Sequence, residues 1–198
     1  METINFLITG VGGQGTVLAS EIMAAAGFAA GFDVKKSDLL GLSVRGGAVL
    51  GHVRWGQPVY SPIVPEGRVD YLLAFEELEA MRHLGQVKST GTILVNKQKI
   101  YPVSVSAGEA VYPSDDEIAA ALKKCSNHVY MVPGIDMALE IGKSQCLNVV
   151  LIGAISGLFD DIDVSVWENT LRDRVKPKFV DMNIAAFRAG RNWMQENR

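Results

Sequence analysis

Residues 10–15 read Gly-Val-Gly-Gly-Gln-Gly and form a loop whose composition suits the binding of a phosphate group. The loop follows the apolar run Ile4–Ile8 and precedes an alanine-rich stretch with helical spacing. Glycines placed between a strand and a helix permit a tight turn and let a phosphate approach the N–H groups of the helix N-terminus. The pattern therefore predicts a strand, a turn and a helix that present a small anion-binding loop.

The Gly-x-Gly-x-x-Gly spacing is also found in dinucleotide-binding enzymes, which need an acid about 20 residues further on to hold the ribose. Here the second strand predicted, Phe32–Lys36, carries two lysines and reaches Asp38 only past Ser37. The loop also lacks the lysine of a nucleoside triphosphate-binding P-loop. Three interpretations stay open from these residues: a dinucleotide, another phosphate-bearing ligand or a neighbouring subunit's cofactor, and a purely structural turn.

A second glycine-bearing segment, 37–47, has little periodicity and is predicted to be a loop. The Arg45 guanidinium suits a bidentate contact with a phosphate or carboxylate, or a salt bridge to a partner protein. The Ser43 hydroxyl suits the same group or a local turn. The candidate cofactor-binding residues are Gly12, Gly13, Gln14, Gly15, Ser43, Arg45, Gly46 and Gly47. No residue is predicted to be catalytic or to bind a metal.

Alternating strand-like and helix-like segments must position these loops. Strands are predicted at 4–8, 69–75, 92–95 and 128–132, and helices at 16–30, 76–84, 114–122 and over most of the chain after 135. Residues 48–55 and 59–62 flank Gly56-Gln57, which predicts a two-residue hairpin. Ser165 and Glu168 have the spacing of a capping box. We therefore expect one domain, 1–198, with a three-layer α/β/α fold, a mainly parallel sheet, an antiparallel hairpin and a helical C-terminal part.

Composition excludes several classes of function. The net charge is −3 and 21% of residues are charged, with no cluster of Lys and Arg of the kind that nucleic acid requires. No apolar run approaches the roughly 18 residues of a membrane span, and the N-terminus lacks the features of a signal peptide, so a cytoplasmic location is expected. Only Cys125 and Cys146 are present, too few for a four-thiolate cluster or a cysteine-rich zinc site.

Eight segments, in order along nearly the whole chain, carry a family resemblance. They are Gly10–Gly15, Gly41–Gly47, His52–Arg54, Ser61–Gly67, Asp70–Glu76, Val111–Pro113, Asn148–Ala154 and Asn183–Gly190. Together they resemble the gamma domain or subunit of the 2-oxoacid:ferredoxin oxidoreductases, most closely the beta subunits of the indolepyruvate branch. One departure is Val44, where the family often has glutamine.

The resemblance implies CoA-dependent oxidative decarboxylation of a 2-oxoacid to an acyl-CoA, carbon dioxide and reduced ferredoxin. Thiamine diphosphate and iron–sulfur clusters supply that chemistry, and the chain lacks both the Gly-Asp-Gly motif and the cysteines for them. The resemblance thus implies a subunit that is inactive alone. A partner subunit would hold thiamine diphosphate and the clusters and would pass electrons to ferredoxin, while this chain contacts coenzyme A.

The sequence leaves further partners and two alternative functions open. Homodimerisation is compatible with the sequence, whereas nucleic acid and membranes are not expected partners. Two alternative functions remain: a free-standing dinucleotide-binding oxidoreductase, and a non-catalytic regulatory or assembly module.

Overall fold

A six-stranded mixed sheet forms the centre of the protein. The computed structural model describes residues 2–41 and 46–198. The strands are β1 (Ile4–Val11), β2 (Asp33–Leu40), β3 (Ala48–Gly56), β4 (Val69–Ala74), β5 (Val87–Asn96) and β6 (His128–Val132). They are ordered β2-β3-β1-β4-β5-β6; β3 runs antiparallel to both neighbours and the remaining pairs are parallel.

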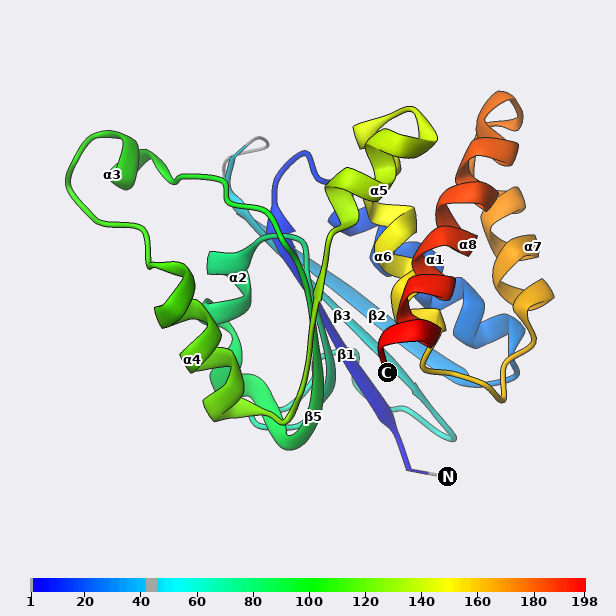
Figure 1. Ribbon diagram of the computed structural model, residues 1–198. Coiled ribbons are helices and arrows are strands. Elements are labelled where there is room, and N and C mark those ends of the chain that lie inside the picture. Colours follow the sequence, from blue (N-terminus) through cyan, green and yellow to red (C-terminus); the bar gives the residue numbers. More distant parts are fainter. Residues whose placement is uncertain (1, 42–45) are drawn as a thin grey trace.

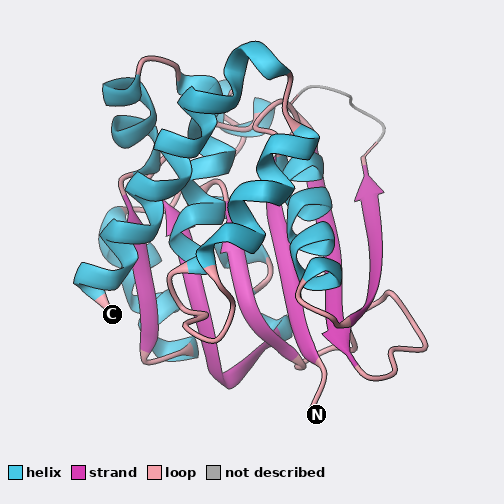
Figure 2. Cartoon of the chain, turned by 90° about the vertical axis from the view of Figure 1, so that its right-hand side faces the viewer, coloured by secondary structure: helices cyan, strands magenta, loops and turns pink. Residues whose placement is uncertain are grey.

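Helices cover both faces of this sheet (Figures 1 and 2). One face carries α1 (Thr16–Ala29), α5 (Gly134–Ile141), α6 (Leu147–Ser156), α7 (Val164–Arg174) and α8 (Val180–Asn197). The other carries α2 (Glu77–Arg82) and α4 (Asp115–Cys125), while α3 (Val103–Ser106) sits on a segment that projects from the body. Short 3-10 turns are η1 (Leu84–Gln86), η2 (Ser144–Cys146) and η3 (Pro177–Phe179). The expected three-layer α/β/α fold is confirmed.

Two apolar cores lie on either side of the sheet. The larger packs α1, α6, α7 and α8 against the strands and contains the fully buried Trp55 and Trp167, whose ring centroids are 5.9 Å apart. The smaller lies under α2 and α4. Because α6 is buried at every position, its sequence is apolar all round rather than amphipathic.

Helices α6 and α8 cross with their backbones in contact. A Cβ atom on Gly190 would lie 1.9 Å from the carbonyl oxygen of Val150, and one on Gly153 would lie 2.0 Å from that of Phe187. Only glycine leaves room for such an approach. The apolar face of α8 includes Ile184, Phe187 and Met194, which are buried.

The hairpin predicted around Gly56-Gln57 is wrong. Residues 59–62, all within the described part, form no strand, and β3 pairs instead with β2, from Asp33 opposite Gly56 to Leu40 opposite Val49. Two prolines near the predicted turn, Pro58 and Pro62, have no N–H to offer a ladder. The prediction of a loop over 37–47 is accordingly wrong for 37–40, which belong to β2.

Helix α7 does not begin with the predicted capping box at Ser165 and Glu168. Its N-cap is Asp163, whose Oδ1 accepts from the Ser165 N–H at 2.7 Å. A capping box does form at α4, where the Ser114 hydroxyl accepts from the Glu117 N–H and the Glu117 carboxylate accepts from the Ser114 N–H. Which side chain caps a helix therefore depends on the residue at which the helix begins. The spacing of Ser and Glu in the sequence does not by itself determine that residue.

This difference is testable in a matched pair of variants. We expect Ser114→Ala to lower the free energy of unfolding by about 1 kcal/mol, because the Glu117 N–H loses its acceptor. Ser165→Ala removes a hydroxyl that caps no helix. This variant should change the free energy of unfolding by less than about 0.5 kcal/mol. Urea denaturation of both variants measures the two effects, and equal losses would contradict the assignment of the cap.

Candidate functional site

The glycine loop is a tight turn between β1 and α1. The Gln14 N–H donates to the Val11 carbonyl at 3.1 Å, and Gly15 is the N-cap of α1 with a φ of 84°. Gly13 also has a positive φ, 108°, and has open space where a side chain would stand. The predicted strand, turn and helix are confirmed, and the first N–H groups of α1 begin directly after the loop.

The two glycine-bearing segments meet. The Gly12 N–H donates to the Gly47 carbonyl at 2.8 Å, and the Gly46 N–H donates to the Gly12 carbonyl at 3.3 Å. These contacts bring Gly46 and Gly47 against the loop although more than thirty residues separate them in sequence. Ser43 and Arg45 lie outside the described residues, so their binding role stays a prediction.

The Gln14 side chain points inward. Its Oε1 accepts from the Val11 N–H at 2.8 Å, and its Nε2 donates to the Phe75 carbonyl at 2.9 Å and to Gln98 Oε1 at 3.0 Å. Both amide hydrogens are thus used within the protein. Gln14 fixes the loop to the ends of β4 and β5, and a contact between Gln14 and a ligand stays a prediction.

A cavity of about 420 Å³ opens beside the loop. It lies between the first turn of α1 and the ends of β2 and β3. Its lining consists of Gly12, Gly13, Gly15, Thr16, Val17, Leu40, Gly41 and Val49. Three of the predicted site residues thus line one hollow, and Gly46 and Gly47 are hydrogen-bonded to Gly12 at its edge.

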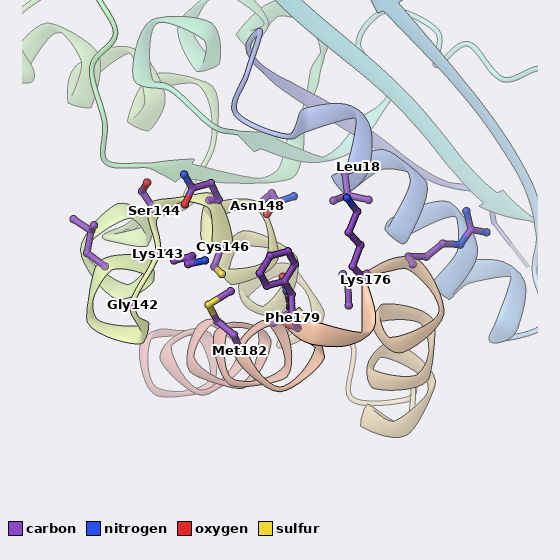
Figure 3. A pocket seen from close by; sticks show the side chains of 14 residues that line it. Leu18, Gly142, Lys143, Ser144, Cys146, Asn148, Lys176, Phe179 and Met182 are labelled. Atoms are coloured by element: carbon purple, nitrogen blue, oxygen red, sulfur yellow. Dashed lines mark hydrogen bonds between the residues drawn. The ribbon is translucent and has the colours of Figure 1, made fainter.

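A larger cavity of about 710 Å³ lies on the other side of the α1 N-terminus (Figure 3). Leu18 lines it from α1, and Phe179 and Met182 line it from the start of α8. Its remaining lining residues are Leu139, Gly142, Lys143, Ser144, Gln145, Cys146, Asn148, Arg174, Val175, Lys176 and Asn183. Among these residues three are basic and none is acidic, so the cavity favours an anionic ligand.

The side chains around this cavity define its chemistry. Lys143 Nζ lies 5.0 Å from the centroid of the Phe179 ring, a cation–π contact. Burial raises the pKa of the Cys146 thiol, with Lys143 opposing the shift, so the cysteine is a poor nucleophile. The arrangement suits binding of a charged ligand rather than covalent catalysis.

Asn148 joins the larger cavity to the glycine loop. It is 4% exposed at the start of α6, and its Nδ2 would lie 2.8 Å from a Cβ atom on Gly15. Its Oδ1 accepts from the Val149 N–H at 3.0 Å, while its Nδ2 donates to none of the described residues. Gly15 is therefore required both by its φ and by this contact, and within the described residues Asn148 Nδ2 has no acceptor beside the larger cavity.

Sequence reasoning missed the three basic residues. Lys143 precedes α6, whereas Arg174 ends α7 and Lys176 follows it, so only the fold brings them to one cavity. They belong to no motif and have no regular spacing, and no sequence signal could have found them. Asn148 was noted only as the start of a segment that resembles the family, and its position against Gly15 was not foreseen.

The dinucleotide interpretation lacks its ribose contact. In that fold the acidic residue ends a strand parallel to and next to β1, but here β3 lies between β1 and β2. The Asp38 carboxylate accepts from Ser20 Oγ at 2.8 Å and pairs with Lys36. Asp38 is therefore already satisfied on a strand that does not adjoin β1.

The described residues contain neither a metal-binding cluster nor a membrane-spanning helix. Within residues 2–41 and 46–198, no group of three or more His, Cys, Asp or Glu side chains could hold a metal ion. In the same ranges, no helix is both long enough and apolar enough to cross a membrane.

Comparison with known proteins shows close relatives along nearly the full length. The indolepyruvate oxidoreductase subunit IorB of Thermococcus kodakarensis is 38% identical over 193 residues, which cover 96% of this chain and 95% of the relative. The subunit of the same name from Archaeoglobus fulgidus is 36% identical over 190 residues, covering 96% and 94%.

Solved structures share the fold. The gamma subunit of a keto/oxoacid ferredoxin oxidoreductase from Geobacter sulfurreducens is 25% identical, with a TM-score of 0.70 over 98% of this chain and 99% of its own. The 2-oxoglutarate:ferredoxin oxidoreductase of Magnetococcus marinus superposes with a TM-score of 0.78 at 20% identity, over 99% of this chain but 32% of that one.

The family assignment rests on the whole chain. The sequence pattern of the pyruvate ferredoxin/flavodoxin oxidoreductase family matches residues 5–193. The identities and the shared fold agree with that match. The chain therefore belongs to the pyruvate ferredoxin/flavodoxin oxidoreductase family and is a small subunit of a 2-oxoacid oxidoreductase.

Proposed function

We propose that this chain is the gamma-type subunit of an indolepyruvate or other aryl-pyruvate ferredoxin oxidoreductase. The observation that carries the proposal is a basic cavity beside a glycine loop, in a chain whose sequence has only two cysteines and no Gly-Asp-Gly motif. Thiamine diphosphate and iron–sulfur clusters therefore belong to a partner subunit, which passes electrons to ferredoxin. The names of the relatives support the aryl-pyruvate branch.

The site on this chain would hold the phosphates of coenzyme A. That ligand carries several phosphate charges, and it is named among the molecules bound in the Magnetococcus marinus structure. The residues here fit it: Gly13 leaves the loop open, α1 supplies N–H groups at its N-terminus, and Lys143, Arg174 and Lys176 supply positive charge. Coenzyme A supplies the thiol that accepts the acyl group.

Each part of the site has a separate role in this proposal. The loop lets a phosphate approach the main chain, and the basic cavity neutralises a second phosphate on the far side of Asn148. Asn148 Nδ2, which has no acceptor among the described residues, is a donor between them. Ser43 and Arg45 remain candidates on sequence grounds.

The projecting segment around α3 is the surface proposed to contact the partner subunit. Tyr101, Val103 and Val111 are 60%, 85% and 91% exposed on this segment, which extends from the body (Figure 1). Large apolar side chains gathered on a projecting surface mark protein interaction sites. A partner that covers them would bury apolar area that this chain alone leaves in water.

The partner contact leads to a prediction. Replacing both valines, Val103→Asp with Val111→Asp, should weaken association with the partner about tenfold or more, because two charges would enter an apolar contact. Glu109→Gln, on the same segment, is the control and should leave association unchanged. Co-purification and sedimentation velocity measure association with the partner subunit. Undiminished association of the double variant would exclude this surface as the partner contact.

Reconstitution with the partner subunit tests the function itself. The complex should reduce ferredoxin when given indolepyruvate and coenzyme A, whereas the isolated chain should oxidise no 2-oxoacid. Oxidation by the isolated chain would refute the proposal. Full activity of the partner without this chain would favour the regulatory or assembly module, and tight binding of NADH or NADPH in a fluorescence titration would favour the dinucleotide enzyme.

The remaining features of the proposal follow from the sequence. We take residues 1–198 as one domain that acts in the cytoplasm within a hetero-oligomer. A second copy of the chain in the same assembly is compatible with the proposal, and light scattering of the purified complex would establish the stoichiometry.

A further inference from the structure

A third cavity lies on the opposite face of the sheet from the proposed coenzyme A site. Its volume is about 300 Å³, at the lower end of the range for small-molecule pockets. It lies between α4, β6 and the start of α2. Its lining residues are Glu77, Lys97, Asp115, Ile118, Ala119, Leu122, Lys123, Val129 and Met131.

Glu77 is a buried carboxylate without a partner in this cavity. It is 5% exposed, and within the described ranges its carboxylate accepts no hydrogen bond and makes no ion pair. Burial raises its pKa, and this effect is opposed by the charges of Lys99 and Lys97. The side chain lines the cavity, where a donor group of a bound ligand can reach its carboxylate.

Its two acidic neighbours each have at least one partner. Glu76 accepts from the Glu79 N–H at 2.9 Å, from the Ile100 N–H at 3.0 Å and from the Tyr112 hydroxyl. Glu79 Oε1 pairs with Arg82 at 3.1 Å, whereas Glu79 Oε2 has no hydrogen-bond partner among the described residues. Glu77 thus differs from the acids beside it, and a role in starting the helix does not account for its side chain.

The rest of the cavity combines positive charge with an apolar wall. Lys97 and Lys123 have no ion-pair partner in the part of the chain that the structure describes, whereas Asp115 pairs with Lys99. The wall includes the buried side chains of Ile118 and Leu122, together with those of Ala119, Val129 and Met131. One buried acid, two lysines and an apolar surface therefore border one small space.

We propose that this cavity binds the zwitterion of an apolar α-amino acid. The ammonium group donates to Glu77, the carboxylate meets Lys97 and Lys123, and the side chain packs on Ile118 and Leu122. A simple anion would be repelled by Glu77, and a neutral apolar molecule would leave that carboxylate buried without a donor. A plain alkylammonium would leave both lysines without an anion. The inference does not depend on the proposed function.

Calorimetric titration of the full chain with L-leucine and L-phenylalanine tests the inference. Saturable binding at millimolar concentration is expected with at least one of them. N-acetyl-L-leucine lacks the ammonium group and L-leucinamide lacks the carboxylate, so both should bind at least tenfold more weakly than L-leucine or not at all. Equal binding of either analogue and L-leucine would overturn the assigned contacts.

Two variants separate Glu77 from a general change in charge. Glu77→Gln should weaken amino-acid binding at least tenfold, while Asp116→Asn, which removes an exposed acid of α4 outside the cavity lining, should leave it unchanged. Circular dichroism confirms that both variants fold. No saturable binding of either amino acid to the unaltered chain, or unchanged binding to Glu77→Gln, would overturn the proposal. Binding of coenzyme A by the reconstituted complex is measured separately, so failure of one proposal does not affect the other.

Discussion

Replacing Gly190 by alanine is expected to lower the free energy of unfolding by about 3 kcal/mol or more, or to prevent folding. The added Cβ would lie 1.9 Å from the Val150 oxygen, 2.8 Å from the Val150 carbonyl carbon and 2.9 Å from the Ala154 nitrogen. All three are backbone atoms and cannot rotate away. Relief requires α8 to move off α6, and α6 is buried at every position.

A matched glycine provides the control for this prediction. Gly85 lies in the 3-10 turn η1, has no heavy atom within 4 Å of an added Cβ and does not have a positive φ. Gly85→Ala should therefore change the free energy of unfolding by less than about 0.5 kcal/mol. Urea denaturation of both variants measures the two free energies of unfolding. If Gly190→Ala were as stable as Gly85→Ala, the backbone-to-backbone crossing of α6 and α8 would be incorrect.

The second large effect concerns the basic cavity. Removing two of its cations together, Arg174→Ala with Lys176→Ala, should raise the KM for coenzyme A in the reconstituted complex at least about tenfold. Both side chains would contact phosphates, which take no part in the reaction, so kcat should change much less than KM. Because both side chains are exposed, added salt should reduce the difference in KM for coenzyme A between the double variant and the unaltered complex.

The control for the charge effect is Lys124→Ala. Lys124 is an exposed basic residue of α4, on the other side of the sheet from α7 and α8, and this variant should leave the KM for coenzyme A unchanged. Initial rates at varied coenzyme A and saturating 2-oxoacid provide the comparison. An unchanged KM in the double variant would show that the basic cavity does not bind coenzyme A. The family assignment would be unaffected, because it rests on the full-length sequence match.

Local patterns predicted the parts of the fold that are locally determined. The run Ile4–Ile8, the glycine loop and the helix after it were predicted correctly because apolar spacing and glycine conformation act within a few residues. Helices were also predicted over most of the chain after residue 135, where α6 spans Leu147–Ser156. Errors arose where a segment depends on a distant partner.

The β2–β3 pairing shows this limit. Ser37 and Asp38 are polar enough to indicate a loop, yet Asp38 is satisfied by Ser20 and Lys36 within the folded protein, so the strand continues. The basic cavity shows the same limit for the site. Lys143 and Lys176 come from different connections, and only the packing of α6, α7 and α8 places them around one space. Glu77 could be read from the sequence as an acid that starts a helix, but not as one left unpaired.

The inward-pointing amide of Gln14 has a thermodynamic consequence. Its side chain holds the Val11 N–H, the Phe75 carbonyl and Gln98 at the same time, and Gly12 is held on both sides by Gly46 and Gly47. The loop is therefore ordered before any ligand arrives. A phosphate that binds there loses its own freedom of motion but does not have to order the chain, so little conformational entropy opposes binding.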